Sequence, residues 1–256
     1  MIPSPIHKVL SVMRELEVKC LVMGGQACVL YGAAEFSRDA DLAVLADAVN
    51  LRRLENALTV LVASVEYVPP FEAQYLERGH AVHFRCARED VRGLRVDVMS
   101  KMRGVDSFAA LWNRRTTVTI GETPDQLDVD VLALPDLVKA KKTQRDKDWP
   151  MIRRLLEANY FAFRTDPTRP RIDFWLRELR SPELLIECAR TFPDAAGAVS
   201  RDRVAVAAAL HDALDTVEHE LRSEEDRERA ADRAYWAPLR KELEQLRHAH
   251  GERAPD

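Results

Sequence analysis

The stretch that decides the fold is CLVMGGQACVLYGAAEFSRDADLAVL, residues 20–45. Its pattern predicts a short apolar strand, a turn at Gly24 and Gly25, a helix of one or two turns, a loop and a second strand. Asp39 and Asp41 take alternate positions in that second strand, so their side chains point to the same face, with Cα atoms about 7 Å apart. Two carboxylates aimed at one point repel each other, and a divalent cation relieves the repulsion.

Magnesium is the cation that such a pair suggests, because it takes oxygen ligands and is commonly held by one or two carboxylates together with substrate phosphates. The glycine turn supplies the second half of the site. A helix that begins at Gly25 or Gln26 offers unpaired backbone N–H groups and the positive end of its dipole to a phosphate. The stretch therefore predicts a crevice in which metal and phosphate meet.

These residues also carry a family resemblance: Gly-Gly-x-Ala from Gly24, then Tyr31-Gly32, then Ser37-x-Asp39-x-Asp41-Leu42. The pattern resembles the signature of the nucleotidyltransferase superfamily, with its polymerase-beta-like fold, and within it the AbiEii-like, toxin-related branch of bacteria. The resemblance covers roughly residues 20–150. One departure is Glu35, which stands where many relatives have arginine.

The resemblance implies roles for individual residues. Asp39 and Asp41 would hold magnesium, and a third carboxylate on a neighbouring strand would complete the site. Gly24 and Gly25 would contact the nucleotide phosphates. Ser37 is a further candidate nucleotide contact, and its alternative is a hydroxyl that bonds local backbone.

Asp97 is the expected third carboxylate. It lies in Leu94–Met99, which forms a predicted hairpin with the alternating strand at residues 80–86. Strands disfavour aspartate, so a carboxylate at this position indicates a function. We expect Asp97 to bind metal and to help deprotonate an attacking hydroxyl. The alternative is an exposed aspartate paired with Arg95 or Arg85.

The second informative stretch is LPDLVKAKKTQRDKDWPMIRRLL, residues 134–156. It predicts a helix that places Lys141 and Arg145 on one face, and another helix that begins near Asp148. Clustered cations stabilise a leaving pyrophosphate. The segment is also similar to the lysine-rich helix and Arg-x-Lys-Asp of AbiEii-like relatives, which implies Lys141, Lys147 and Asp148 as site residues. The alternative is a solvated basic helix with Asp148 as a plain N-cap.

Other polar residues are expected to be structural. Asp128 and Asp130 repeat the Asp-x-Asp spacing, but no glycine turn precedes them at the right distance. We expect these two side chains on the solvent face of a half-buried edge strand. His80 and His83 are expected to be ordinary surface or core residues, because this chemistry needs no histidine.

Composition sets the class of protein. Apolar residues make up 46% of the chain and charged residues 31%, which is typical of globular proteins. The N-terminal residues lack the features of a secretory signal, and no apolar run approaches the roughly 20 residues of a membrane span, so we expect a cytoplasmic protein without a membrane partner. The four cysteines have no CxxC spacing and are expected to be buried and unpaired. The net charge of −4 restricts any RNA contact to a local surface.

The sequence therefore predicts an α/β fold: a nucleotidyltransferase core with a small mixed sheet in residues 1–132 and a helical C-terminal region in residues 133–256. The expected reaction transfers a nucleoside monophosphate from a nucleoside triphosphate to an acceptor hydroxyl, with two Mg²⁺ ions about 3.5–4 Å apart. The resemblance implies tRNA or protein as acceptor, for the toxin of a toxin–antitoxin pair with a cognate antitoxin. The alternatives are a small-molecule (antibiotic) acceptor and, favoured by Glu35, a nucleotide-binding regulatory protein without turnover.

Overall fold

The computed structural model describes residues 4–249 and 251, and the chain divides into two compact units. The first, here called the sheet unit, is made of Met1–Leu30, Ala34–Ala140 and Ala234–Asp256. The second, the helical unit, is made of Tyr31–Ala33 and Lys141–Arg233. No helix in the described part of the chain combines the length and the apolar character that crossing a membrane requires.

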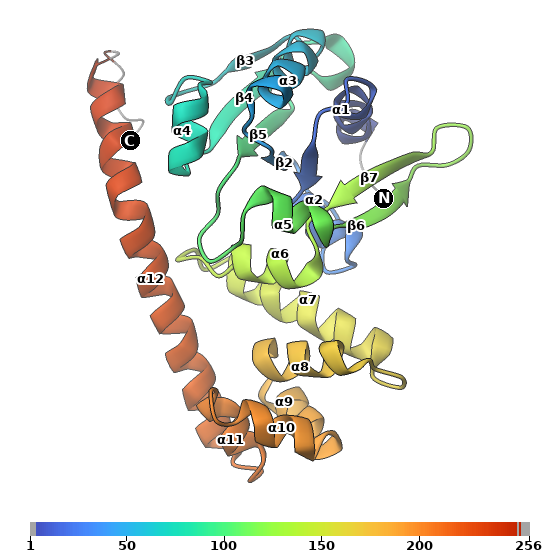
Figure 1. Ribbon diagram of the computed structural model, residues 1–256, viewed down its shortest axis with the longest axis vertical. Helices are drawn as coiled ribbons and strands as arrows, with labels where there is room; N and C mark the ends of the chain where they lie inside the picture. Colours follow the sequence, from blue (N-terminus) through green and yellow to red (C-terminus); the bar gives the residue numbers. More distant parts are fainter. Residues whose placement is uncertain (1–3, 250, 252–256) are drawn as a thin grey trace. The chain divides into compact units, whose positions relative to one another are not determined.

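The sheet unit is built on a mixed sheet of seven strands within the described residues, in the order β3-β4-β5-β2-β1-β7-β6 (Figure 1). The strands are β1 (Cys20–Val22), β2 (Ala40–Val44), β3 (Ala63–Val65), β4 (Val82–Cys86), β5 (Arg95–Met99), β6 (Thr116–Ile120) and β7 (Leu127–Val131). The predicted hairpin β4–β5 is antiparallel, and so is the pair β6–β7, whereas β2 runs parallel to β5 and β1 parallel to β7. The predicted α/β fold with a mixed sheet is confirmed.

The helices of the sheet unit are α1 (Ser4–Glu15), α2 (Gly24–Leu30), α3 (Ala48–Val60), α4 (Ala73–Arg78), α5 (Phe108–Asn113) and α6 (Leu134–Ala140), with a 3₁₀ turn at Glu89–Val91. The first residues of α3 show how local sequence sets a helix start. Asp47 caps α3 by accepting a hydrogen bond from the Asn50 N–H at 2.7 Å. Val49, in the first turn of this helix, is 66% exposed.

The boundary between the units falls later than the sequence suggested. Residues 134–140 form α6, which belongs to the sheet unit rather than to the C-terminal region. An ion pair explains this placement: the buried Asp136 carboxylate accepts two hydrogen bonds from Arg114, at 2.5 and 2.7 Å. The chain also returns to the sheet unit at its end, where Glu242 accepts a hydrogen bond from the buried His80 at 2.7 Å and another from Arg78.

The position of strand β7 in the sheet differs from the one predicted. It was predicted to be an edge strand, but it lies between β1 and β6, and β6 forms the edge. Its aspartates are satisfied across the hairpin: Thr119 donates to Asp128 at 2.6 Å, and Thr117 and Arg115 each donate to Asp130 at 2.8 Å. The second Asp-x-Asp motif therefore already has its partners.

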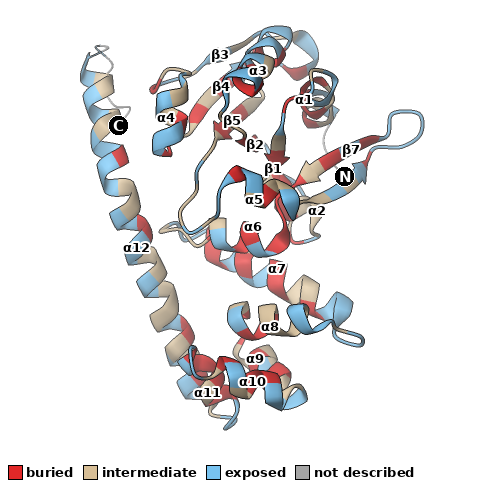
Figure 2. Cartoon of the chain, in the orientation of Figure 1, coloured by how far each residue is buried: buried red, intermediate tan, exposed pale blue. Residues whose placement is uncertain are grey.

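The helical unit contains α7 (Asp148–Phe163), α8 (Arg169–Glu178), α9 (Pro182–Thr191), α10 (Pro193–Val199), α11 (Val204–Ala209) and the first part of α12 (Leu214–Ala249), whose residues from Ala234 onward belong to the sheet unit. Figure 2 shows the buried faces of α8 to α11. Trp175 is the centre of this core, fully buried and in edge-to-face contact with Tyr160. The helical structure breaks between α11 and α12, where Asp212 has a φ of 53°.

Asn50 joins three segments of the sheet unit and is 2% exposed. Its amide accepts from the Lys19 N–H at 2.7 Å and donates to the carbonyls of Lys19 and Leu45 at 3.0 and 2.8 Å. These bonds tie α3 to the start of β1 and the end of β2. Buried backbone groups that lose such a partner keep their desolvation penalty.

Asn50→Ala should therefore lower the free energy of unfolding by about 2–4 kcal/mol, because three buried hydrogen bonds are lost together. The measurement is urea denaturation followed by circular dichroism. Asn113→Ala, at the exposed end of α5, is the control and should change stability by no more than about 0.5 kcal/mol. Equal effects of the two substitutions would contradict the assigned role of Asn50.

Candidate functional site

A polar face of the sheet, on β2, β4 and β5, holds the predicted carboxylates. Val96 and Val98 of β5 are fully buried on the other face, so Asp97 between them points to the polar one. Asp97 is in register with Asp41 of the parallel strand β2 and with His83 of the antiparallel strand β4. Because residues in register point to the same face of a sheet, these three side chains lie side by side.

Asp39 and Asp41 stand at the entry of β2. Asp41 is the second residue of the strand, whereas Asp39 lies just before it, and both are half-buried. The Asp41 carboxylate accepts a hydrogen bond from the Gly25 N–H at 3.1 Å. The Asp39 side chain makes no hydrogen bond within residues 4–249 and 251, although its charge is felt by Arg95. The sequence placed both aspartates within the strand, whereas the structure places Asp39 before its first residue; metal binding by Asp39 stays a prediction.

The glycine turn is packed against these carboxylates. Gly24 has a φ of 59°, and a Cβ on it would lie 1.9 Å from the Asp41 Oδ2. A Cβ on Gly25 would lie 2.4 Å from the Ser37 Oγ. Two glycines are thus needed for the turn to approach β2 and the preceding loop. That they also bind phosphate stays a prediction, since the Gly25 N–H is directed at Asp41.

Ser37 and Gln26 support the loop before β2. The Ser37 hydroxyl lies 3.4 Å from the Asp39 carbonyl, which is the local bond that the sequence left open as an alternative. Gln26 was missed by the sequence analysis. It is buried in α2, donates from Nε2 to the Ser37 carbonyl at 3.1 Å, and has an Oε1 atom without a hydrogen-bond partner in the described residues.

Asp97 is engaged by two neighbours. Arg95 donates from Nε to Oδ1 at 2.7 Å and from Nη2 to Oδ2 at 2.9 Å, and the His83 Nδ1 lies 2.8 Å from Oδ1. Burial acts to raise the pKa of Asp97, but the hydrogen bonds and charges of His83 and Arg95 outweigh it and lower the pKa below its ordinary value. The pairing with Arg95 is the one considered as the alternative, on a side chain that is only 17% exposed.

The sequence analysis gave Arg95 and His83 no functional role in this site: Arg95 was named only as a partner in the alternative for Asp97, and His83 was expected to be an ordinary surface or core residue, whereas both contact Asp97. The pKa of Arg95 is raised above its ordinary value, chiefly by its hydrogen bond to Asp97, so the guanidinium is a permanent cation here. Strand alternation would have identified Arg95, because a residue two positions before Asp97 shares its face. His83 could not be found from spacing, since its approach depends on hairpin register.

The donor set fits magnesium in part. Asp39, just before β2, and Asp41, within it, carry the hard oxygen ligands that Mg²⁺ prefers. Asp97 does not fit as a third ligand in the arrangement seen, because Arg95 and His83 occupy its oxygens. Accordingly, no three His, Cys, Asp or Glu side chains converge on a common metal position in residues 4–249 and 251.

The remaining predicted residues lie in the helical unit. Helix α6 ends at Ala140 and residues 141–147 form turns, so Lys141 and Arg145 do not share a helical face as expected. Both instead bind Asp148, at 3.3 and 2.7 Å, and Thr143 donates to the same carboxylate at 2.6 Å. Burial opposes ionisation of Asp148, but these partners lower its pKa.

This cluster differs from its expected form in one further respect. Asp148 is the first residue of α7, after Lys147 at the N-cap position, and is not itself the cap. Lys147 is exposed. The structure thus gathers the predicted residues into two groups, the glycine–aspartate group of the sheet unit and the Lys141–Asp148 group of the helical unit.

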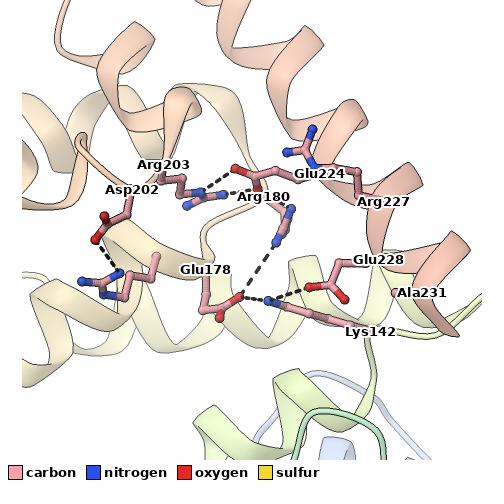
Figure 3. A pocket seen from close by; sticks show the side chains of 10 residues that line it. Lys142, Glu178, Arg180, Asp202, Arg203, Glu224, Arg227, Glu228 and Ala231 are labelled. Carbon is pink, nitrogen blue, oxygen red and sulfur yellow. Dashed lines mark hydrogen bonds and ion pairs between the residues drawn. The ribbon is translucent and has the colours of Figure 1, made fainter. Parts of the chain in front are cut away.

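A cavity of about 520 Å³ in the helical unit is lined almost entirely by charged side chains (Figure 3). Glu224, whose side chain is 15% exposed, accepts hydrogen bonds from Arg203 at 2.9 and 3.0 Å and from Arg180 at 2.7 Å. Arg203 also donates to the carbonyls of Leu176 and Leu179. The carboxylates of this cavity thus form ion pairs with neighbouring arginine and lysine side chains. Through Arg203, these contacts link Glu224 of α12 to the end of α8.

The sequence matches no known protein-family model, and no curated protein is significantly similar to it. The chemistry of the site must therefore be argued from its own residues. Two features carry that argument: the glycine turn pressed against Asp41, and the alignment of Asp41 with Asp97 on the neighbouring parallel strand.

Gly24→Ala should lower the free energy of unfolding more than Gly→Ala does at another position with a positive φ. A matched control exists in Gly32, which has a φ of 74° but would place a Cβ in open space, with no atom beyond its chain neighbours within 4 Å. Both substitutions incur the left-handed penalty of about 1–2 kcal/mol. Gly24→Ala should cost at least about 1 kcal/mol more, because the new methyl group displaces the Asp41 carboxylate. Equal losses in urea denaturation would contradict this packing.

The Glu224 network predicts a pH dependence. Burial acts to raise the pKa of Glu224, but its bonds to Arg203 and the nearby cations lower it from the ordinary value of 4.5. A carboxyl group whose pKa is lower in the folded state stabilises the fold above its unfolded pKa and loses that contribution as the pH falls. Wild-type stability should thus fall between about pH 5 and pH 3, and Glu224→Gln should show a smaller fall.

Glu224→Gln should also lower the free energy of unfolding at neutral pH. Glu224→Gln should lose about 3–5 kcal/mol at pH 7, because Arg203 and Arg180 keep their buried charges without the anion. The control is Glu218→Gln on the same helix, where the carboxylate is 42% exposed and lies 3.6 Å from Arg222. It should change stability by about 0.5 kcal/mol or less and leave the pH profile unchanged. An identical acid profile for wild type and Glu224→Gln would refute the assignment.

Proposed function

We propose that the chain is a magnesium-dependent nucleotidyltransferase, which moves a nucleoside monophosphate from a nucleoside triphosphate to an acceptor hydroxyl. The observation that carries the proposal is the register of Asp41 with Asp97, with Asp39 at the strand entry and the Gly24 turn packed against Asp41. The superfamily resemblance of the same residues supports it. The proposal uses residues of the sheet unit alone.

Each residue has a role in the proposed site. Asp39 and Asp41 hold the magnesium, which when bound neutralises phosphate charge and polarises the reacting phosphoryl group. Gly24 and Gly25 let the turn approach β2 closely, because the Asp41 carboxylate and the Ser37 hydroxyl occupy the space that side chains on these residues would need; contact of the turn with the nucleotide phosphates is part of the proposal. The Gly25 N–H orients Asp41 through the bond at 3.1 Å. Positioning and charge, rather than a covalent intermediate, supply the catalysis.

The proposed reaction is a direct displacement at the α-phosphorus. The acceptor oxygen forms a bond to phosphorus while the bond to the bridging oxygen breaks, and pyrophosphate leaves with that electron pair. The proton of the acceptor hydroxyl passes to water. Asp97 is a poor proton acceptor in this site, because its pKa is lowered; its part is to hold negative charge and to fix Arg95.

The acceptor is proposed from the toxin-related resemblance: a hydroxyl of tRNA or of a protein, in the cytoplasm, with an antitoxin as a regulatory partner. A small-molecule acceptor such as an antibiotic is the alternative within the same chemistry. These proposals share the metal and the nucleotide, so one labelling experiment addresses them together.

A second candidate function is nucleotide binding without turnover. The observation that favours it is the engagement of Asp97 by Arg95 and His83, which leaves the third carboxylate of the expected metal centre occupied. A protein of this kind would bind nucleoside triphosphate without releasing pyrophosphate. Binding and turnover are separately measurable, so the two candidates are distinguishable.

The test is incubation of the purified chain with each of the four nucleoside triphosphates, labelled at the α-phosphate, together with Mg²⁺, total tRNA and cell extract. We expect label on one macromolecular band, or on a small molecule for the antibiotic alternative. Asp39→Asn and Asp41→Asn should each reduce labelling by more than about 100-fold, since even outer-shell partners of a metal cost 10–100-fold.

The chain provides its own control in the second Asp-x-Asp motif. Asp128→Asn removes a carboxylate that Thr119 binds across β6 and β7, and labelling should persist in this variant. Nucleotide binding by calorimetry without any labelling would favour the second candidate. Labelling that survives in Asp39→Asn and Asp41→Asn would overturn the proposed site.

A further inference from the structure

We propose that the guanidinium of Arg95 stands in the place of a second metal ion beside Asp97, so that the site binds one divalent ion instead of two. The inference rests on the proposed function, because it concerns how the same carboxylates are neutralised. It changes the role of Asp97 from a metal ligand to the anchor of a fixed cation.

Arg95 and Asp97 form a bidentate ion pair with well-defined geometry. Arg95 meets Asp97 with two parallel hydrogen bonds, from Nε at 2.7 Å and from Nη2 at 2.9 Å, each to a different carboxylate oxygen. A bidentate arrangement of this kind fixes the guanidinium in direction as well as distance. The two residues lie two positions apart on β5, so the same strand face presents both.

His83 is the second side chain that contacts the Asp97 carboxylate. Its Nδ1 lies 2.8 Å from the Asp97 Oδ1 and 3.0 Å from the Arg95 Nη2. It comes from β4, the strand on the far side of Asp97 from β2. A metal ion that took Asp97 as a ligand would have to displace contacts from two strands.

The charges of these side chains favour a single divalent ion. Asp39, Asp41 and Asp97 carry three negative charges, and Arg95 carries one positive charge that interacts with both Asp97 and Asp39. The net charge of the four side chains is therefore two negative units, and one divalent ion neutralises it. Two divalent ions beside Arg95 would leave this group with two positive units before the triphosphate arrives, which is an unfavourable resting state.

The neighbouring hairpin position supplies a matched control. Arg85 lies in register with Arg95 on β4, but its guanidinium bonds to Glu66, at 3.0 Å from Nε, and to the Gly93 carbonyl at 2.9 Å. It is an arginine of the same hairpin without a contact to the carboxylates of the site in the described residues. Substitution of Arg85 thus tests for general effects on the hairpin.

The experiment is a titration of the full chain with Mn²⁺, in which free Mn²⁺ is counted by electron paramagnetic resonance. We expect one bound Mn²⁺ per chain in the wild type and in Arg85→Met. Arg95→Met, which keeps most of the length of the side chain and removes its charge, should bind two. Arg95→Lys restores a cation and should return the count to one. If Arg95→Met does not fold, as judged by circular dichroism, Arg95→Gln replaces it.

Each outcome separates this inference from the proposed function. Two bound ions in the wild type would overturn the role of Arg95 while supporting the metal centre. One ion in both the wild type and Arg95→Met would likewise overturn it. No binding of Mn²⁺ by the wild type would remove the metal from the proposed function and the inference with it. A rise from one to two in Arg95→Met, absent in Arg85→Met, supports the inference.

Discussion

The contact between the Gly24 turn and the Asp41 carboxylate is the constraint on which the site depends. A side chain at Gly24 would occupy the position of the Asp41 oxygens, and the positive φ of this residue directs the chain from β1 into α2. The backbone holds the same approach from the other side, since the Met23 N–H donates to the Asp41 carbonyl at 2.9 Å. The turn thus positions both the side chain and the backbone of Asp41, and Asp41 in turn lies in register with Asp97. Sheet register then carries this placement to β5 and β4, where Arg95 and His83 are found.

Ion pairs of low solvent exposure stabilise loops and helix ends in both units, away from the contact between Gly24 and Asp41. Asp136 with Arg114, Asp148 with Lys141, and Glu224 with Arg203 are carboxylates of low exposure, each with a cation at hydrogen-bond distance. Such pairs contribute little when compared with apolar replacements, but the loss of one partner is costly because the other stays buried and charged. They select one arrangement of loops and helix ends, as at residues 141–147, which no apolar pattern specifies. The Asp97–Arg95 pair belongs to this class by geometry, and it differs from the others in lying beside a further carboxylate, Asp41, on the neighbouring strand.

Features set by neighbouring residues could be predicted from the sequence. The cap at Asp47, the glycine turn and the alternation that places Asp97 on the polar face all depend on residues two to four positions apart. Features set by distant pairing could not. The interior position of β7 depends on its pairing with β1, and the turns at 141–147 depend on the buried Asp148 that collects their donors. His83 approaches Asp97 only because β4 pairs with β5 in one register out of several that the same sequence allows.

The two Asp-x-Asp motifs show why spacing alone does not identify a metal site. In β7 the motif is surrounded by donors from β6 and the residues before it, and Thr117, Thr119 and Arg115 satisfy its carboxylates. At β2 the sequence supplies a turn without side chains instead, and Asp39 makes no side-chain hydrogen bond in the described part of the chain. A carboxylate without a hydrogen-bond donor is repelled by a second carboxylate beside it, and a nearby cation relieves that repulsion; the charge of Arg95 interacts with Asp39 in this way. The partners that surround a motif, more than its spacing, thus decide whether it is structural: the β7 motif has its donors, whereas Asp39 of the β2 motif has no hydrogen-bond donor in the described residues.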